Sequence, residues 1–230
     1  MAKNNPPTLS IIGAEPRYGL ADAARFARLR PQTLKRWTAG YRYAGGQQPP
    51  VLRKASPEAG LSFFDLLEAA FVRAYRERGI SLQSIRSALD FAAANLEVER
   101  PLLLERFLHD GRDLFARFQS QSDEDGLMNV SRGGQVAWPA AVEQYLEEIE
   151  HERELAIRWW PEGRDRQVAI DPRYEFGWPM VPSGAIRTDL LAERWEAGER
   201  MVAIAQDFGV SEDEVEDALR YEQINYAAAA

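Results

Sequence analysis

The spacing of apolar residues predicts a helix–turn–helix near the start of the chain. Leucine and alanine recur across residues 20–27 at the spacing of one helical face. A second, shorter helix begins at Pro31, because proline suits a first helical position, and it turns Leu34 and Trp37 inward. Gly40 is placed to end this helix. We therefore predict two short helices joined by a tight turn.

A β wing and two longer helices are expected next. Tyr41–Tyr43 and Pro50–Leu52 have the character of short strands, with two glycines at 45–46 between them. Ser62 and Ser81 are each placed to cap a following helix, because a serine hydroxyl accepts from the free N–H groups of a first helical turn. The pattern is typical of a winged helix–turn–helix followed by two helices.

The middle of the chain is predicted to be rich in β-hairpins, with one helix over residues 142–149. Short runs with strand character are separated there by turns that contain glycine. The expected strand pairs are 106–109 with 113–118, 127–131 with 135–138, and 156–160 with 167–170.

A second helical module is predicted from Asp171 onward. Thr188 is expected to cap its first helix, Gly209 to close its second, and Ser211 with Glu214 to form a capping box for its third. The fold class is mainly α with small β-hairpins, α+β overall. The expected divisions are a disordered arm at 1–16, a winged helix–turn–helix at 17–98, a β-hairpin-rich middle at 99–170 and a three-helix, helix–turn–helix-like domain at 171–226.

Composition removes several classes of protein. The 230 residues contain no cysteine and only two histidines, which excludes a disulfide framework, a thiol nucleophile and cysteine-based metal sites. No apolar run approaches the roughly 18 residues of a membrane span. The polar N-terminus lacks the apolar stretch of a signal peptide. We expect a cytoplasmic protein without membrane contact.

Catalysis is poorly supported by the residues present. His109 and His151 stand in no recognisable motif, and we interpret them as surface or satisfied histidines, with His151 at an acidic, solvated helix end. The runs 123–125 and 147–148 pair carboxylates, but solvated charge explains them better than a metal site. Neither a P-loop nor a dinucleotide glycine fingerprint occurs. We expect no catalytic residue, no metal and no cofactor, so the protein is not predicted to be an enzyme.

Charge divides the chain into two halves of opposite sign. The formal net charge is −8, yet residues 1–120 hold 18 Lys and Arg against 12 Asp and Glu, whereas residues 121–230 hold 10 against 24. A basic half joined to an acidic half indicates two partners of opposite character.

The basic charge is concentrated where the helix–turn–helix is predicted. Residues 17–54 carry nine bases against one acid, which is typical of a protein that binds duplex DNA. Gln32 could then read adenine, and Lys35 or Arg36 guanine or phosphate, from the major groove. One alternative is a solvated basic face on a three-helix core without a partner, and another is a structural or adaptor protein whose basic face binds something other than DNA. The candidate DNA-binding residues are Arg17, Arg28, Arg30, Gln32, Thr33, Lys35, Arg36, Tyr41, Arg42, Tyr43 and Arg53.

The C-terminal module has a similar pattern but the opposite charge. Residues 204–211 resemble a helix–turn–helix, yet the helix that follows carries six acids against Arg220 alone. Phosphates would repel that helix, so we expect either a protein-binding surface or an acidic solvated face. Five aromatic residues between 159 and 178 are expected to be mainly core, with a partner contact as the alternative. They are Trp159, Trp160, Tyr174, Phe176 and Trp178.

Residues from Tyr18 to about 96 resemble the MerR-type winged helix–turn–helix. The resemblance is carried by Tyr18 with Ala23-Ala24-Arg25, by residues 33–37 (Thr-Leu-Lys-Arg-Trp), by the wing at 41–43 and by residues 79–86. MerR regulators usually continue into a long coiled-coil helix and an effector domain, often with ligating cysteines. This chain instead turns to predicted hairpins after Pro101 and has no cysteine.

A second stretch looks like a small domain of unknown function that is often encoded beside PIN-like ribonuclease toxins. The resemblance is carried by the pattern Asp-Pro-x-x-x-Phe-Gly-x-Pro across residues 171–179 and by Ser-Gly-x-Ile-x-Thr across 183–188. Together with the N-terminal module, it resembles the long VapB-type antitoxins of actinobacteria. This resemblance implies a homodimer that binds double-stranded operator DNA, represses its own operon and neutralises a PIN-like ribonuclease toxin.

The resemblance and the acidic charge together suggest toxin-binding residues in the last module. An acidic surface is a plausible cover for the basic cleft of a ribonuclease. The candidates are Phe176, Trp178, Arg187, Trp195, Glu212, Asp213, Glu216 and Asp217. The rival hypothesis is a stand-alone MerR-like transcriptional regulator that senses a small ligand through its C-terminal half.

Overall fold

The computed structural model describes residues 12–229 apart from residues 44, 53–57, 106–144 and 146, and the side chains as far as Gln223. Most of the expected arm, the two hairpins expected at 106–118 and 127–138, and Arg53 therefore lie outside the described residues. The N-terminal elements are β1 (Pro16–Tyr18), α2 (Leu20–Phe26), α3 (Pro31–Ala39), β2 (Tyr41–Tyr43), β3 (Gly46–Gln48), β4 (Leu61–Ser62), α4 (Phe63–Glu77), α5 (Leu82–Leu96) and η1 (Pro101–Leu103). The later ones are β5 (Ile149–Glu152), β6 (Leu155–Trp159), η2 (Glu175–Gly177), β7 (Met180–Val181), β8 (Ile186–Arg187), α8 (Thr188–Glu196), α9 (Met201–Phe208) and α10 (Glu212–Ala229).

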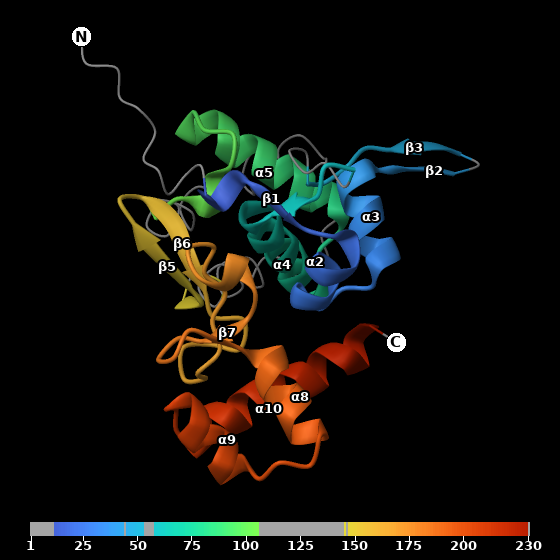
Figure 1. The fold of residues 1–230 in the computed structure, drawn as a ribbon. Helices are drawn as coiled ribbons and strands as arrows, with labels where there is room; N and C mark the ends of the chain where they lie inside the picture. Colours follow the sequence, from blue (N-terminus) through green and yellow to red (C-terminus); the bar gives the residue numbers. More distant parts are fainter. Residues whose placement is uncertain (1–11, 44, 53–57, 106–144, 146, 230) are drawn as a thin grey trace.

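The described chain is mainly helical, with small two-stranded antiparallel sheets, as predicted. Figure 1 shows the helices α2–α5 at one end of the molecule and α8–α10 at the other, with the β5–β6 hairpin beside them. Pro16 pairs with Ser62 in the β1–β4 ladder. The folded part of the chain therefore begins before the boundary expected at residue 17.

The helix–turn–helix forms for the reasons that the sequence indicated. Pro31 occupies the first turn of α3, and Leu34 and Trp37 are buried as expected. Gly40 caps the helix with φ of 69°, and a Cβ at this position would lie 2.5 Å from the Gln48 carbonyl oxygen. Only glycine therefore allows β3 to return so close to the end of α3.

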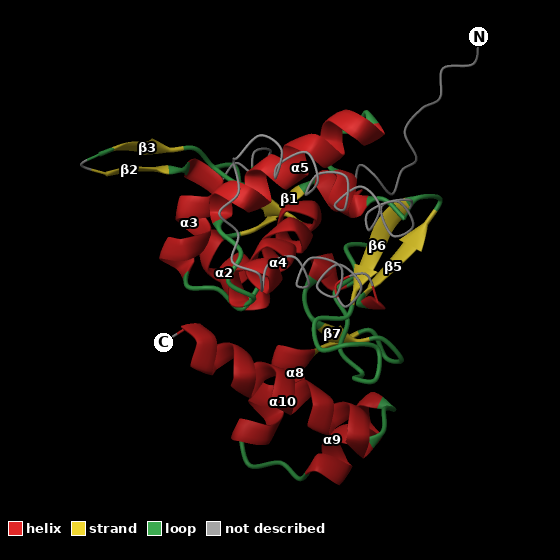
Figure 2. Ribbon diagram, turned by 180° about the vertical axis from the view of Figure 1, so that it is seen from behind, coloured by secondary structure: helices red, strands yellow, loops and turns green. Residues whose placement is uncertain are grey.

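The second strand of the wing differs from its prediction. Tyr41–Tyr43 pairs with Gly46–Gln48 rather than with Pro50–Leu52, and the resulting hairpin projects away from the helices (Figure 2). Val51 and Leu52 are instead buried, and both of their N–H groups donate to the Trp37 carbonyl oxygen, at 2.9 and 3.0 Å. Because these two apolar side chains are buried against the helices, residues 51 and 52 do not belong to the exposed hairpin.

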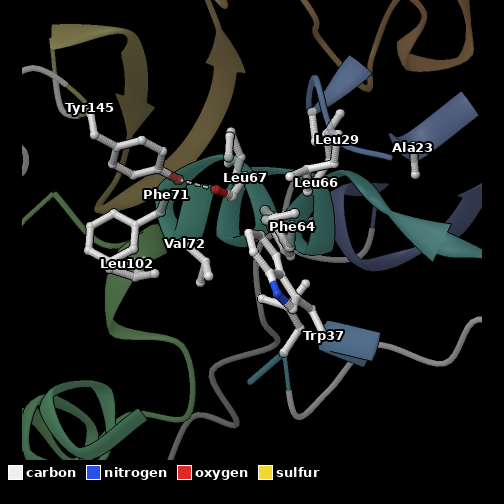
Figure 3. Packing of buried hydrophobic residues seen from close by; sticks show 14 of the residues in the cluster. Ala23, Leu29, Trp37, Phe64, Leu66, Leu67, Phe71, Val72, Leu102 and Tyr145 are labelled. Atoms are coloured by element: carbon white, nitrogen blue, oxygen red, sulfur yellow. Dashed lines mark hydrogen bonds between the residues drawn. The ribbon is translucent and has the colours of Figure 1, made fainter. Parts of the chain in front are cut away.

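Helix α4 is the centre of the larger hydrophobic cluster. Ser62 caps it through a capping box with Asp65, and Ser81 caps α5, so both of these predictions are confirmed. Figure 3 shows Leu66 and Phe71 of α4 among the buried side chains of this cluster. Tyr145 reaches this cluster from the later part of the chain, and its hydroxyl donates to the Leu67 carbonyl oxygen at 2.8 Å.

The middle of the chain corrects two predictions. Ile149 lies in strand β5, not at the end of a helix, and β6 takes β5 as its partner in place of residues 167–170. The pairing predicted between residues 156–160 and residues 167–170 occurs only as a single β-bridge, Trp159 with Ile170. The β5–β6 turn has Arg153 and Glu154 at φ of 49° and 74°. Because the favoured residues for such a turn are asparagine, aspartate and glycine, the sequence carried no hairpin signal there.

The C-terminal module packs α8, α9 and α10 around a separate small cluster that includes Leu191, Ile204 and Val215. Gly209 closes α9 in the left-handed conformation, and Ser211 with Glu214 forms the expected capping box. Thr188 is not the cap of α8, because it lies inside the first turn and is buried.

Helix α10 joins the two modules by packing against α2. Glu222 accepts from Arg25 at 2.8 Å and from the Thr188 hydroxyl at 2.5 Å, and its side chain is only 3% exposed. Burial raises the pKa of Glu222 above its usual range, whereas Thr188 and Arg25 act to lower it. One carboxylate thus ties together α2, α8 and α10.

Other contacts extend this junction along β1 and η2. The Tyr18 hydroxyl donates to the Gly177 carbonyl oxygen at 2.8 Å, and Arg17 donates to the Pro172 carbonyl oxygen at 2.9 Å. The rings of Phe26 and Trp178 meet edge to face at 5.3 Å. The two modules are therefore packed against each other through buried side chains.

Replacement of Glu222 by alanine should lower the free energy of unfolding by about 3 kcal/mol, because it leaves Arg25 without its buried partner. The matched control is Glu216→Ala, which removes an exposed ion pair with Arg220 on the same helix and should cost less than about 1 kcal/mol. Urea denaturation measures both variants. Equal losses would contradict the importance assigned to the junction.

Candidate nucleic-acid interface and acidic module

The outer face of α3 is exposed and basic. Leu34 and Trp37 turn inward, so Gln32, Lys35 and Arg36 point to solvent. Arg30, at the N-cap position, is also exposed, and Thr33 is half-buried. The structure thus brings together on α3 four of the predicted DNA-binding residues, Gln32, Thr33, Lys35 and Arg36, with Arg30 at its N-cap.

The wing hairpin (β2 and β3) adds aromatic and amide groups to this face. Tyr41, Arg42 and Tyr43 are all exposed, and the Arg36 guanidinium lies 5.5 Å from the centre of the Tyr41 ring. Gln47 is exposed on β3 opposite Arg42. Gln47 is not among the predicted DNA-binding residues, because the prediction placed the second strand four residues too late.

Two predicted DNA-binding residues are turned toward the C-terminal half. Arg17 pairs with Glu15 in addition to its bond to Pro172. Arg28 pairs with Glu162 at 2.5 Å, and its guanidinium lies 5.9 Å from the centre of the Tyr221 ring. These arginines hold the modules together, which leaves the exposed basic groups on α3 and the wing hairpin.

The acidic residues of α10 also divide into two groups. Glu212, Asp213 and Glu216 are exposed, and Glu216 forms an ion pair with Arg220. Asp217 is buried, 7% exposed. Its carboxylate accepts from Arg166 at 3.1 Å, from Arg220 and from the Gln167 N–H. Asp217 therefore secures the loop before β7 and has no oxygen directed to a surface partner.

The aromatic residues near the junction are only partly core. Trp159 is fully buried, as expected, but Tyr174 and Phe176 are 48% and 78% exposed. Trp178 is half-buried beneath Arg187, whose guanidinium lies 4.0 Å from the indole centre. Trp195 is exposed on α8. The prediction that these aromatic residues are mainly core is therefore wrong for Tyr174 and Phe176.

His151 lies in β5, not at a solvated helix end. Burial lowers its pKa to about 4, and the nearby Arg164 guanidinium adds to this effect. The imidazole is therefore neutral near pH 7 and half-buried within the hairpin.

A cavity of about 200 Å³ lies between the return segment at Val51–Leu52 and α5. Glu68 of α4 lines it, together with Leu89 and Leu102. Burial raises the pKa of Glu68 to about 7, although Arg100 acts in the opposite direction. Arg100 also pairs with Asp65 at 2.7 Å, so a small buried ionic group stands at the start of α4.

The helix–turn–helix and its basic outer face define the class of the N-terminal module. Residues 16–89 match the family model described as “Putative DNA-binding HTH domain”. The N-terminal module is therefore a helix–turn–helix domain similar to the one that this model describes.

Similarity to known proteins extends well beyond that domain. The chain is 30% identical over 223 residues to “Putative antitoxin VapB45” of Mycobacterium tuberculosis, covering 89% of this chain and 92% of the relative. It is 26% identical over 218 residues to “Uncharacterized protein Rv2308” of the same organism, covering 89% of each chain. The chain therefore belongs to the family that includes the protein named putative antitoxin VapB45.

A solved structure has the same fold. The crystal structure of Rv2018 from Mycobacterium tuberculosis superposes with a TM-score of 0.69 at 26% identity, covering 89% of this chain and 97% of that one. Among the residues that the model describes, no helix is both long and apolar enough to cross a membrane.

Glu68→Gln should flatten the pH dependence of stability between about pH 4.5 and 7. In this window the folded protein keeps a proton on Glu68 that the unfolded chain has lost, so stability falls as pH rises, by about 1–3 kcal/mol in total. The variant mimics the protonated carboxyl and should lose this slope. Urea denaturation across the window measures it, with the exposed Glu77→Gln as control. An unchanged slope in Glu68→Gln would contradict the assignment.

Proposed function

We propose that this protein is the antitoxin of a type II toxin–antitoxin pair, which binds and neutralises a PIN-like ribonuclease and represses its own operon by binding operator DNA. The observation that carries the proposal is the similarity to a putative antitoxin across both modules, not the helix–turn–helix alone. That relative is named for a class of protein that is not enzymatic.

DNA binding is assigned to α3 and the wing hairpin, as in MerR-like regulators. Helix α3 is the recognition helix, whose first turn carries Gln32 and Thr33 to base edges, while Lys35 and Arg36 contact bases or phosphates. The wing hairpin places Arg42 against the adjacent backbone or minor groove. A homodimer matches the two-fold symmetry of operators, and light scattering at micromolar concentration tests it.

Toxin binding is assigned to the C-terminal module. A ribonuclease must attract phosphate, so its substrate cleft is basic, and the exposed acids Glu212, Asp213 and Glu216 complement such a surface. Asp217 is left out of this surface because its carboxylate is fully engaged within the chain.

Co-expression with the protein encoded by the adjacent gene tests the proposal. A tag on this chain should capture that protein, and its ribonuclease activity should disappear in the complex. A chain that binds its upstream DNA but captures no adjacent gene product would overturn the antitoxin assignment and favour a ligand-sensing regulator.

Lys35→Ala and Arg36→Ala should each weaken operator binding and reduce the slope of log K against log salt by about one, because each removes a phosphate or base contact. Capture of the toxin should be unchanged. The matched control is Arg200→Ala, an exposed arginine in the C-terminal module. Fluorescence anisotropy at several salt concentrations measures all three, and an equal effect of Arg200→Ala would argue against α3 as the DNA contact.

Neutralisation of the acidic face in the triple variant Glu212→Gln, Asp213→Asn, Glu216→Gln should slow toxin association at least tenfold at low salt, because electrostatic attraction acts mainly on the association rate. A triple variant of the N-terminal module with the same loss of charge serves as control: Glu77→Gln, Asp90→Asn, Glu97→Gln. Stopped-flow mixing measures the rates. Similar association rates for the two triple variants would contradict the hypothesis that the acidic residues of α10 attract the toxin.

A further inference from the structure

The most exposed large apolar side chain among the described residues is Phe176. It is 78% exposed, and Tyr174, two residues earlier, is 48% exposed. The same chain buries Trp159, Phe26 and Tyr221 completely. The exposure of Phe176 is therefore not explained by the lack of a hydrophobic core. A large apolar ring held in solvent indicates a surface that a partner covers.

The backbone that presents Phe176 is in an unfavourable conformation. Glu175, Phe176 and Gly177 follow one another at φ of 44°, 55° and 79°, in the left-handed region. Only the glycine occupies that region at no steric cost, and a bulky aromatic residue there is rare. Such strain persists where the surrounding structure fixes the chain, and it concentrates at functional sites.

The surrounding structure does fix this turn. The Tyr174 carbonyl oxygen accepts from the Gly177 N–H at 2.8 Å, and the Gly177 carbonyl oxygen accepts from the buried Tyr18 hydroxyl. A Cβ on Gly177 would lie 2.3 Å from that hydroxyl oxygen. At the start of the loop, Asp171 is fully buried and accepts from Arg158 and Arg173. Phe176 is therefore presented by a rigid loop.

A rigid aromatic side chain is suited to bind another protein. It loses little conformational freedom on association, so more of its contact energy appears as affinity. Aromatic residues that fill a pocket on the partner are also typical of the few positions that dominate an interface.

Acidic side chains border this loop. The Arg187 guanidinium lies 4.0 Å from the centre of the Trp178 ring, directly after the turn, and the charges of Glu175 and Glu193 act on this guanidinium. Arg187 is itself paired with Asp189. Arg173, which lies over the Tyr174 ring, is in turn paired with Asp171 and Glu152. Acidic side chains therefore outnumber basic ones around the turn. A partner that fits this surface has an apolar pocket rimmed by lysine or arginine.

We propose that the turn Tyr174–Gly177 is a preorganised docking element, in which Phe176 is the anchor that enters an apolar pocket with a basic rim on the toxin. This inference rests on the proposed function, because it names the toxin as the occupant. It separates two contributions to binding: the acids of α10 accelerate encounter, and Phe176 holds the complex together.

The test measures affinity and stability in the same set of full-length variants. Phe176→Gly removes the ring and relieves the strain, so it should weaken binding of the purified adjacent gene product at least thirtyfold, mainly through a faster dissociation rate, while Tm stays the same or rises. Glu175→Asp is the matched control, because aspartate tolerates the left-handed conformation better than glutamate and keeps both the negative charge and the ring; it should bind within threefold of the wild type.

The outcomes separate the two proposals. If the wild type captures the adjacent gene product and Phe176→Gly does so with unchanged affinity, the anchor is overturned and the antitoxin assignment stands. If Glu175→Asp loses as much affinity as Phe176→Gly, the conformation of the turn and not the ring supports binding, and the anchor is again overturned. If the wild type captures nothing, both proposals fail.

Discussion

The arrangement of the two modules depends on one buried carboxylate. Glu222 is held by Arg25, 197 residues earlier in the chain, and by Thr188, 34 residues earlier. An ionised carboxylate that is so well buried is tolerated only where charged and hydrogen-bonding partners surround it. The contact therefore restricts α10 to one position against α2 and α8. The edge-to-face contact of Phe26 with Trp178, and the bond from Tyr18 to Gly177, lie along the same junction.

This constraint changes the meaning of the charge split. Counted along the sequence, residues 17–54 form one basic segment. In the structure, Arg17, Arg25 and Arg28 are directed to acceptors in the C-terminal half. The exposed bases within the described part of this segment are Arg30, Lys35, Arg36 and Arg42. A count of charge indicates what kind of partner a chain attracts, but only packing decides which arginines are free to meet it.

Predictions from the sequence succeeded where the determining interaction is local. The caps at Ser62, Ser81 and Ser211 and the start of α3 at Pro31 each depend on residues within one helical turn. Failures occurred where distant partners decide. Val51 and Leu52 leave the wing because their N–H groups donate to the Trp37 carbonyl oxygen. The Thr188 hydroxyl donates to Glu222 and does not cap α8, and Asp217 accepts from Arg166 and does not face a partner. The residues alone did not indicate the exposure of Phe176, since an aromatic residue beside glycine is equally compatible with a core position, and only the resemblance placed it among the toxin-binding candidates.

The two surfaces to which we assign partners share no residue, yet they stand on one packed body. Figures 1 and 2 both place the wing hairpin and α9 at distant ends of the molecule. The turn Tyr174–Gly177 lies between these ends, attached through Tyr18 to the strand that precedes α2. Similarity to the relatives covers 89% of this chain, as expected if both modules and the junction must be kept together. A substitution at Lys35 can therefore affect DNA contact alone, whereas one at Gly177 or Glu222 disturbs the common support of both surfaces.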